Sequence, residues 1–184
     1  SKPVYTPEDL KKLKIFTWAG DYKSGQLYEK HGYQPVPLAI TDVLSGLQTG
    51  LINTLAFNPM YALSQQLFGI VDNMLDMKWG NMTAAIVIDN RTWNRIKPEH
   101  QSVMLDIAQN IGNGFQKKNR HETNKAIDVM KEYGLTVNTP TPDQVKKWED
   151  FIERMYPDLR GSLIDEVTFD RLMEIKKEMD SLSN

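Results

Sequence analysis

The 184-residue sequence contains no cysteine, which excludes disulfide bridges, thiolate metal sites and cysteine nucleophiles. No apolar run approaches the ~20 residues that a membrane-spanning helix needs, and no signal peptide is visible. A formal net charge of −2 and a pI near 5.9 exclude the basic surface that nucleic-acid binding requires. We therefore expect no nucleic-acid partner.

Recognisable catalytic and metal-binding motifs are also missing. The histidines His31, His100 and His121 lie far apart in polar surroundings, and no His-x-x-x-His pair or paired acidic spacing accompanies them. Gly-x-Ser-x-Gly, the phosphate-binding loop and Gly-x-Gly-x-x-Gly are absent, and no strand precedes Gly112-Asn-Gly114. We therefore expect no enzyme: no catalytic residue, no metal and no cofactor. We interpret the histidines as solvated surface side chains.

The sequence does contain enough apolar material for a folded core. Hydrophobic residues make up 40% of the chain and aromatic residues 9%, which excludes intrinsic disorder. In the first sixty residues, β-forming runs alternate with short helical runs, an order typical of an α/β layer with a largely parallel sheet. The predicted strands are residues 13–18, 34–38 and 52–57, and the predicted helices between them are residues 26–30 and 41–50.

The middle of the chain predicts one dominant helix. A helix over residues 61–74 and a strand over residues 82–88, apolar almost throughout, come first. A helix then begins at Lys97-Pro-Glu99, and its residues 116–125 are nearly all polar, as in a helix that bridges two packed bodies. A single helix to Tyr133 is the simpler interpretation; two helices broken at residues 112–114 is the alternative. The apolar stripe consists of Val103, Met104, Ile107, Ala108 and Ile111.

The last third predicts a short strand and two helices. Residues 135–137 form the strand. Thr141-Pro-Asp-Gln144 is a capping box with proline at the first helical position, so a helix follows it and ends at Tyr156-Pro157. A final helix covers about residues 165–182.

Three aromatic residues stand at the ends of predicted strands. Trp18, Phe57 and Trp79 each lie beside glycine, asparagine or proline. Ligands of open α/β sheets bind outside the carboxyl ends of the strands. A single ring in such a place is more often part of the core, but three at equivalent places favour a pocket.

The chain resembles the solute-binding subunits of tripartite ATP-independent periplasmic (TRAP) transporters, the DctP-like proteins. The similarity lies in an ordered set of segments that covers nearly the whole chain. These are Tyr5-Thr-Pro-Glu-Asp-Leu-Lys-Lys-Leu-Lys-Ile15, Trp18-Ala-Gly-Asp21, Gln34-Pro-Val-Pro-Leu38, Thr41-Asp-Val-Leu44, Leu47-Gln-Thr-Gly-Leu-Ile52, Asn58-Pro59, Asp89-Asn-Arg-Thr-Trp93 and Tyr156-Pro-Asp-Leu-Arg-Gly161.

The resemblance implies an α/β, periplasmic-binding-protein-like clamshell of two lobes, with the ligand between them. By that comparison residues 1–80 and 124–184 form the second lobe, and residues 81–123 supply a strand and the long helix to the first. It also implies that an N-terminal stretch of the first lobe is missing. The expected function is capture of a small organic ligand in the periplasm and its delivery to a TRAP membrane permease, without catalysis.

The sequence departs from the family pattern at the expected ligand site. Many members place an arginine in a Leu-Arg-(Val/Ile) strand, where its fork grips a ligand carboxylate; here Lys14 occupies the matching place. Residues 16–18 replace a Pro-Asn pattern of acid-binding members. The ligand is therefore an organic acid or a more apolar, amphipathic compound. The expected ligand contacts are Lys14, Thr17, Trp18, Phe57, Asn58 and Trp79.

Two other classes of function stay open at this point. The chain is alternatively part of an α/β hydrolytic enzyme, because its many acidic residues allow unseen catalytic pairs. It is otherwise a protein-interaction module without a small-molecule ligand. We also expect self-association of this chain, because the apolar segment at residues 82–88 would expose strand edges and apolar surface.

Overall fold

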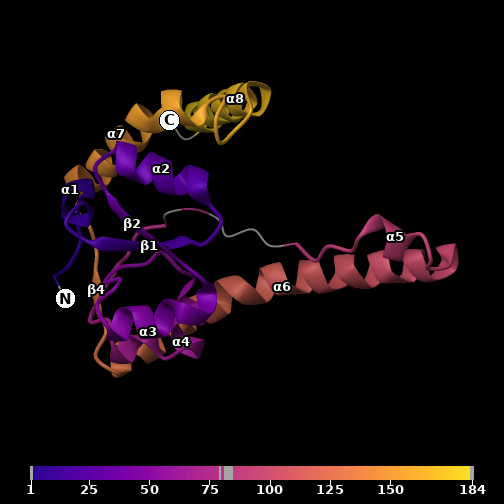
Figure 1. Ribbon diagram of the computed structural model, residues 1–184, viewed down its shortest axis with the longest axis horizontal. Helices are drawn as coiled ribbons and strands as arrows, with labels where there is room; N and C mark the ends of the chain where they lie inside the picture. The colour runs from indigo at the N-terminus through magenta and orange to yellow at the C-terminus, as the bar shows by residue number, and fades with distance from the viewer. Residues whose placement is uncertain (1, 79, 81–84, 183–184) are drawn as a thin grey trace. The chain divides into compact units, whose positions relative to one another are not determined.

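A computed structural model describes residues 2–78, 80 and 85–182 (Figure 1). The chain divides into two compact units. The sheet unit comprises residues 1–56, 70–77 and 136–184, and the helix unit comprises residues 57–69 and 78–135. The assignment of residues to two lobes made from the sequence stays a prediction.

The sheet unit is built around a parallel strand pair. Strands β1 (Lys14–Trp18) and β2 (Gln34–Leu38) pair in parallel with Phe16 opposite Val36, and helix α2 (Tyr22–Lys30) connects them. The parallel arrangement predicted from the sequence is thus confirmed for these elements. Two of the five β2 residues are prolines, which donate no hydrogen bond to a ladder and therefore occur in edge strands.

The predicted strand at residues 52–57 is wrong in extent. In the described structure only Thr54 makes a bridge, beside Ile15 of β1, and the Phe16 amide donates to the Thr54 carbonyl at 2.9 Å. The Lys14 amide donates instead to the Asn53 side-chain oxygen at 2.8 Å. An asparagine side chain competes with the backbone for ladder hydrogen bonds, which explains why regular pairing is not extended here.

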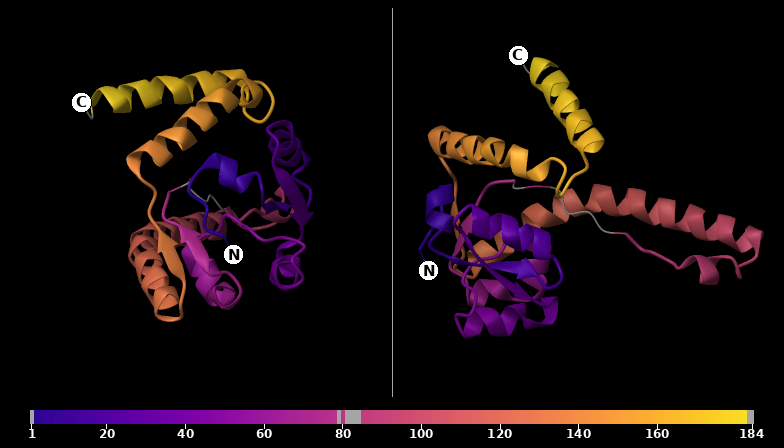
Figure 2. Two further views of the ribbon diagram at one scale, coloured as in Figure 1. Left: turned by 90° about the vertical axis from the view of Figure 1, so that its left-hand side faces the viewer. Right: turned by 45° about the horizontal axis from the view of Figure 1, so that its top comes forward.

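Two helices cover opposite faces of the strand pair (Figures 1 and 2). Helix α2 lies on one face, and helix α3 (Val43–Gln48), which follows the 3₁₀ turn η1 (Ile40–Asp42), lies on the other. Helix α3 approaches the strand closely at Gly46, where a Cβ atom would stand 3.0 Å from Cδ1 of Leu38 and 3.2 Å from Cγ1 of Ile52. A side chain at this position would therefore require the Leu38 and Ile52 side chains to shift by a few tenths of an ångström.

The core of the sheet unit joins the strands to the C-terminal helices. Helices α1 (Pro7–Leu10) and α7 (Pro142–Leu159) pack against each other, and the buried cluster contains Ile15, Tyr33, Trp148 and Phe151. The Trp148 indole donates to the Tyr5 carbonyl at 2.9 Å, which fixes the N-terminal segment against α7.

The predicted capping box at the start of α7 is confirmed, but its predicted end is wrong. The Thr141 hydroxyl accepts from the Gln144 amide, and the Gln144 side chain accepts from the Thr141 amide. The helix continues through Pro157 to Leu159. Helix α8 (Glu166–Leu182) follows, and Arg160 joins the two helices through paired 2.8 Å hydrogen bonds to Asp170.

The helix predicted over residues 61–74 is wrong in extent, because a second parallel pair of strands takes up part of this segment. Helix α4 is confined to Pro59–Ser64; the 3₁₀ turn η2 (Leu67–Gly69) and strand β3 (Asn73–Leu75) follow, and β3 pairs with β4 (Thr136–Asn138). The helix ends because Gln66 adopts a positive φ of 54°, a left-handed conformation that does not continue a helix.

In the helix unit, α6 (Pro98–Glu132) is a single helix of 35 residues, preceded by the short α5 (Asn90–Trp93). The predicted single helix is confirmed, and the alternative break at residues 112–114 is wrong. Ala126 and Met130 are buried on α6, which packs against α4. The apolar stripe predicted near the start of α6 is instead exposed. The side chains of Val103, Ile107 and Ile111 are each more than half accessible to solvent.

The predicted strand at residues 82–88 is not found in the part that the structure describes. Residues 82–84 lie outside the described residues, and residues 85–88 form no regular element. Ile86 and Val87 are fully or almost fully exposed. An apolar strand of this kind needs cover on both faces, and the described residues do not bury these side chains.

Candidate ligand-binding site

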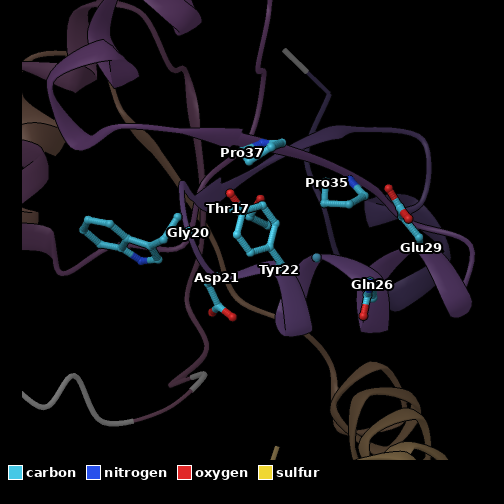
Figure 3. A pocket seen from close by; sticks show the side chains of 10 residues that line it. Thr17, Gly20, Asp21, Tyr22, Gln26, Glu29, Pro35 and Pro37 are labelled. Atoms are coloured by element: carbon cyan, nitrogen blue, oxygen red, sulfur yellow. The ribbon is translucent and has the colours of Figure 1, made fainter.

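The sheet unit contains a hollow of about 150 Å³ beside the carboxyl end of β1 (Figure 3). Three elements form its wall: the end of β1 with the turn that follows it, the first two turns of α2, and the outer strand β2. This is the place where the carboxyl ends of parallel strands present ligands in α/β folds. The lining residues are Thr17, Trp18, Gly20, Asp21, Tyr22, Gly25, Gln26, Glu29, Pro35 and Pro37.

Thr17 is the most deeply buried side chain of this hollow. Its exposed fraction is 6%, because β1 buries its three central residues and exposes both ends. In Figure 3 it lies among Tyr22, Pro35 and Pro37. Its hydroxyl makes no hydrogen bond to any other described residue, and the oxygen is not fully enclosed, so a hydrogen-bond partner can reach it from the hollow. A solute in the hollow would supply that partner.

Two aromatic rings line the same hollow at its exposed rim. Trp18 is 46% exposed and meets the buried Phe16 ring edge to face, with centroids 5.4 Å apart. Tyr22 opens α2 and is 77% exposed. Because β1 ends at Trp18 and the chain turns at Gly20, whose φ is +95°, the Tyr22 ring returns beside the strand end. The two rings present flat apolar surface to whatever enters.

The polar groups of the hollow are acidic or neutral. Asp21 begins α2, and its carboxylate accepts from the Ser24 amide at 3.1 Å. Gln26 and Glu29 follow on the face of α2 that also carries Tyr22, at helical spacings of four and seven residues. No lysine, arginine or histidine belongs to the lining.

The cations of α2 are engaged away from the hollow. The Lys23 ammonium donates to the Ser162 carbonyl at 3.0 Å. The Lys30 ammonium and the His31 ring both contact Asp158, at 2.5 Å and 2.9 Å. The hydrogen bond from Lys30 lowers the pKa of the Asp158 carboxyl, and the contact with His31 acts in the same direction. These contacts tie α2 to the end of α7.

The structure places Lys14 at the opposite end of β1 from Trp18. They are four positions apart along the strand, which is roughly 13 Å at 3.3 Å per residue. The Lys14 ammonium donates to the Gly50 carbonyl at 3.0 Å, and the residue does not line the hollow. Lys14 is therefore not brought together with Thr17 and Trp18.

Two of the remaining predicted contacts lie outside the sheet unit. Phe57 and Asn58 belong to the helix unit. The Phe57 ring stacks on Tyr61 with centroids 4.7 Å apart, and the Asn58 side chain caps α4 by accepting from the Met60 amide at 2.8 Å. Trp79 lies outside the described residues.

Sequence reasoning missed most of the hollow's polar lining. Asp21, Tyr22, Gln26 and Glu29 were not predicted as ligand contacts. The signal that points to them is the spacing of the three α2 residues along one helical face, directly after a strand end.

Within residues 2–78, 80 and 85–182, no group of three or more histidine, cysteine, aspartate or glutamate residues is placed to hold a metal ion. In the same part of the chain, no helix combines the length and apolarity that crossing a membrane requires.

Comparison with known proteins gives a family match over most of the chain. Residues 1–161 match the family described as bacterial extracellular solute-binding protein, family 7. The 2,3-diketo-L-gulonate-binding periplasmic protein of Escherichia coli (strain K12) is 30% identical over 138 residues, 74% of this chain and 42% of that protein. The ectoine-binding periplasmic protein of Halomonas elongata is 29% identical over 108 residues, 58% of this chain and 31% of that protein.

Solved structures give the same fold. The periplasmic ectoine-binding protein of the Halomonas elongata TRAP transporter superimposes with a TM-score of 0.82 at 20% identity, covering 95% of this chain and 56% of that one. A TRAP periplasmic solute-binding protein of Actinobacillus succinogenes 130z, with bound L-galactonate, gives 0.69 at 21% identity, covering 84% and 50%. The chain thus spans about half the length of the proteins it matches. The predicted fold class, that of the two-lobed TRAP periplasmic binding proteins, is confirmed.

Proposed function

The chain belongs to family 7 of the bacterial extracellular solute-binding proteins, and from this premise we propose that its protein binds a small organic solute in the periplasm and delivers it to a TRAP membrane permease. The observation that carries the proposal is the family match across residues 1–161. The named relatives are periplasmic proteins that bind small organic solutes, and proteins of this family and fold are not enzymes.

We assign the hollow beside β1 as the part of the solute site that the sheet unit contributes. Thr17 and Trp18 are the proposed contacts from β1, because both line a concave surface that joins a buried polar group to an exposed ring. Phe57, Asn58 and Trp79 remain proposed contacts from the rest of the chain. Lys14 supports the far end of β1 through Gly50 and takes no part in this assignment.

The proposed mechanism is a change of population between an open and a closed form. A solute that contacts both lobes binds the closed form more tightly and shifts the equilibrium toward it. A solute held by one lobe alone has equal affinity for both forms and shifts nothing. The closed form is then the one that the permease recognises.

Binding is tested on the intact protein by calorimetric titration with sugar acids, dicarboxylates, ectoine, amines and amphiphiles. We expect at least one class to bind, and Trp18→Ala to weaken it by about tenfold, since an aromatic contact contributes on the order of 1–2 kcal/mol. Trp93→Ala in α5 is the matched control and leaves affinity unchanged. If Trp18→Ala binds like the wild type, the site assignment is wrong; turnover of a hydrolase substrate would refute the function itself.

We also propose that this 184-residue chain self-associates through the exposed apolar residues of α6. Ile107, Ile111 and Phe115 follow one another at spacings of four residues on one face of α6, each is more than half exposed, and such surface drives association when it is contiguous. Sedimentation velocity at several concentrations tests this, with Ile111→Lys expected to shift the chain toward monomer. A monomer at every concentration without any substitution would refute self-association and would leave the solute-binding proposal in place.

A further inference from the structure

The hollow beside β1 has a charge pattern that distinguishes between solute classes. Its lining holds two carboxylates, Asp21 and Glu29, and no cationic side chain. Within the described chain neither carboxylate makes an ion pair, since the neighbouring Lys23 and Lys30 contact Ser162 and Asp158. An anionic group placed here would meet two like charges without compensation.

We propose that the hollow takes a positively charged group of the solute, an ammonium or an amidinium. This inference rests on the proposed function and names the solute class for the same site. The rings of Trp18 and Tyr22 attract such a cation through their π-faces, and Asp21 and Glu29 supply the opposite charge. The solute is then an amine or a zwitterion whose cationic end enters this unit.

The unpartnered hydroxyl of Thr17, a residue that is otherwise buried, is the second observation that points to a ligand here. It lines the hollow, its residue is 6% exposed, and it makes no hydrogen bond to another described residue. An ammonium or amidinium N–H donates to a hydroxyl oxygen, and a charged donor makes the stronger hydrogen bond. Pro35 and Pro37 of the β2 wall have no amide hydrogen, so they offer no backbone donor to an anionic group.

The steric frame of the hollow leaves room for such a group. Gly20 and Gly25 line it, and a Cβ atom built on either glycine meets no atom within 4 Å. A cavity of about 150 Å³ accommodates a short alkylammonium head but not a large ring system. The site is therefore a subsite for one end of the solute.

The test uses a matched pair of probes, n-butylammonium and butyrate, which have equal carbon number and opposite charge. Binding to the protein is followed by backbone amide shifts of Trp18, Gly20 and Gly25 in heteronuclear NMR. We expect saturable shifts with n-butylammonium, weakened as salt is raised, and none with butyrate. Equal or larger shifts with butyrate would overturn the inference.

Two substitutions remove charge and keep shape. Asp21→Asn retains a residue that caps α2 equally well, and Glu29→Gln is isosteric. Each is expected to weaken n-butylammonium binding about threefold and the pair roughly tenfold, as for partly solvated ion pairs. Glu149→Gln, on the exposed surface of α7, is the control and leaves binding unchanged. Unchanged binding in the double variant would overturn the inference.

A steric variant separates the subsite from a general surface effect. Gly25→Leu places a side chain in the open space of the hollow and is expected to abolish the n-butylammonium shifts while the fold is retained in the amide spectrum. Shifts that persist in Gly25→Leu refute the subsite. A solute that binds as an acid, with affinity lost in Trp18→Ala but unaffected by Asp21→Asn and Glu29→Gln, refutes the charge inference while the proposed function stands.

Discussion

We predict that removing the Tyr33 hydroxyl stabilises the protein, although most single substitutions lower the free energy of unfolding. Tyr33 is 4% exposed and lies in the core cluster of the sheet unit, with its ring 5.3 Å from Phe151 and 5.8 Å from Tyr28. Its hydroxyl is buried and has no hydrogen-bond partner among the described residues. The substitution Tyr33→Phe removes this oxygen and leaves the ring contacts unchanged, including the Lys11 ammonium 5.8 Å from the ring centroid.

The expected gain follows from the cost of the unpaired group. A buried hydroxyl without a partner costs about 1–3 kcal/mol relative to its solvated state in the unfolded chain. The atom removed is small, so the loss of packing offsets part of this. We therefore expect Tyr33→Phe to raise the free energy of unfolding by about 1 kcal/mol. The control Tyr22→Phe removes a hydroxyl from a residue that is 77% exposed and is expected to change stability by less than about 0.5 kcal/mol.

Urea denaturation followed by circular dichroism measures this gain, with the slope unchanged and the midpoint raised. Burial, and then the charge of Glu8, raise the pKa of Tyr33 well above its usual range. The unfolded tyrosine therefore loses its proton first, and wild-type stability falls as the pH rises above about 10. Tyr33→Phe has no such ionisable group, so the difference in free energy of unfolding between the variant and the wild type grows above about pH 10. A destabilised Tyr33→Phe would show that the hydroxyl is hydrogen-bonded and would refute the reasoning.

Three further predictions concern the sheet unit. Gly25→Ala is expected to stabilise the chain by about 0.5–1 kcal/mol in urea denaturation, because its Cβ meets open space inside α2; a loss of stability would contradict this. Trp148→Ala removes a side chain that is 2% exposed and its hydrogen bond to Tyr5, so we expect a loss of at least about 3 kcal/mol, and a loss below about 1 kcal/mol would contradict the assigned core. Asp158 has a lowered pKa, set first by the hydrogen bond from Lys30, so its stabilising effect is present above the unfolded pKa near 4 and is lost as the pH falls through the folded value. Asp158→Asn is expected to flatten this acid dependence of the thermal midpoint, and an unchanged profile would exclude the role.

Local chemistry predicted the fold well wherever it acts over a few residues. The capping box at Thr141 and the proline start at Pro98 located the two long helices, because caps and first-turn prolines act within one helical turn. Strands β1 and β2 were located because X-Pro restricts the residue before it and β-formers surround Ile15.

Predictions that depended on distant contacts were less successful. The helix over residues 61–74 ended early because Gln66 adopts a left-handed conformation, which no residue-type preference announces. The stripe on α6 was recognised correctly as apolar, yet periodicity does not tell whether a partner covers it.

The residues expected from the sequence to contact the solute coincide only in part with the lining of the hollow, and as ligand contacts they stay predictions. Thr17 and Trp18 follow from the rule that ligands lie at the carboxyl ends of parallel strands. Glu29 comes to the hollow through the crossover helix, whose rotation about its axis depends on packing against β2. Lys14 does not line the hollow, because it stands at the other end of the five-residue strand β1 from Trp18.

The prolines of β2 have a consequence for how this sheet can associate. Pro35 and Pro37 are two residues apart, so their nitrogen atoms point to the same side of the strand. Each nitrogen lacks hydrogen, and in the described chain β2 pairs with β1 alone. The outer border of the sheet therefore offers carbonyl groups without alternating donors, and a foreign strand finds no template there for amyloid-like growth or for peptide addition. A protein that recognises this border meets backbone acceptors and side chains, but no backbone donor at Pro35 or Pro37.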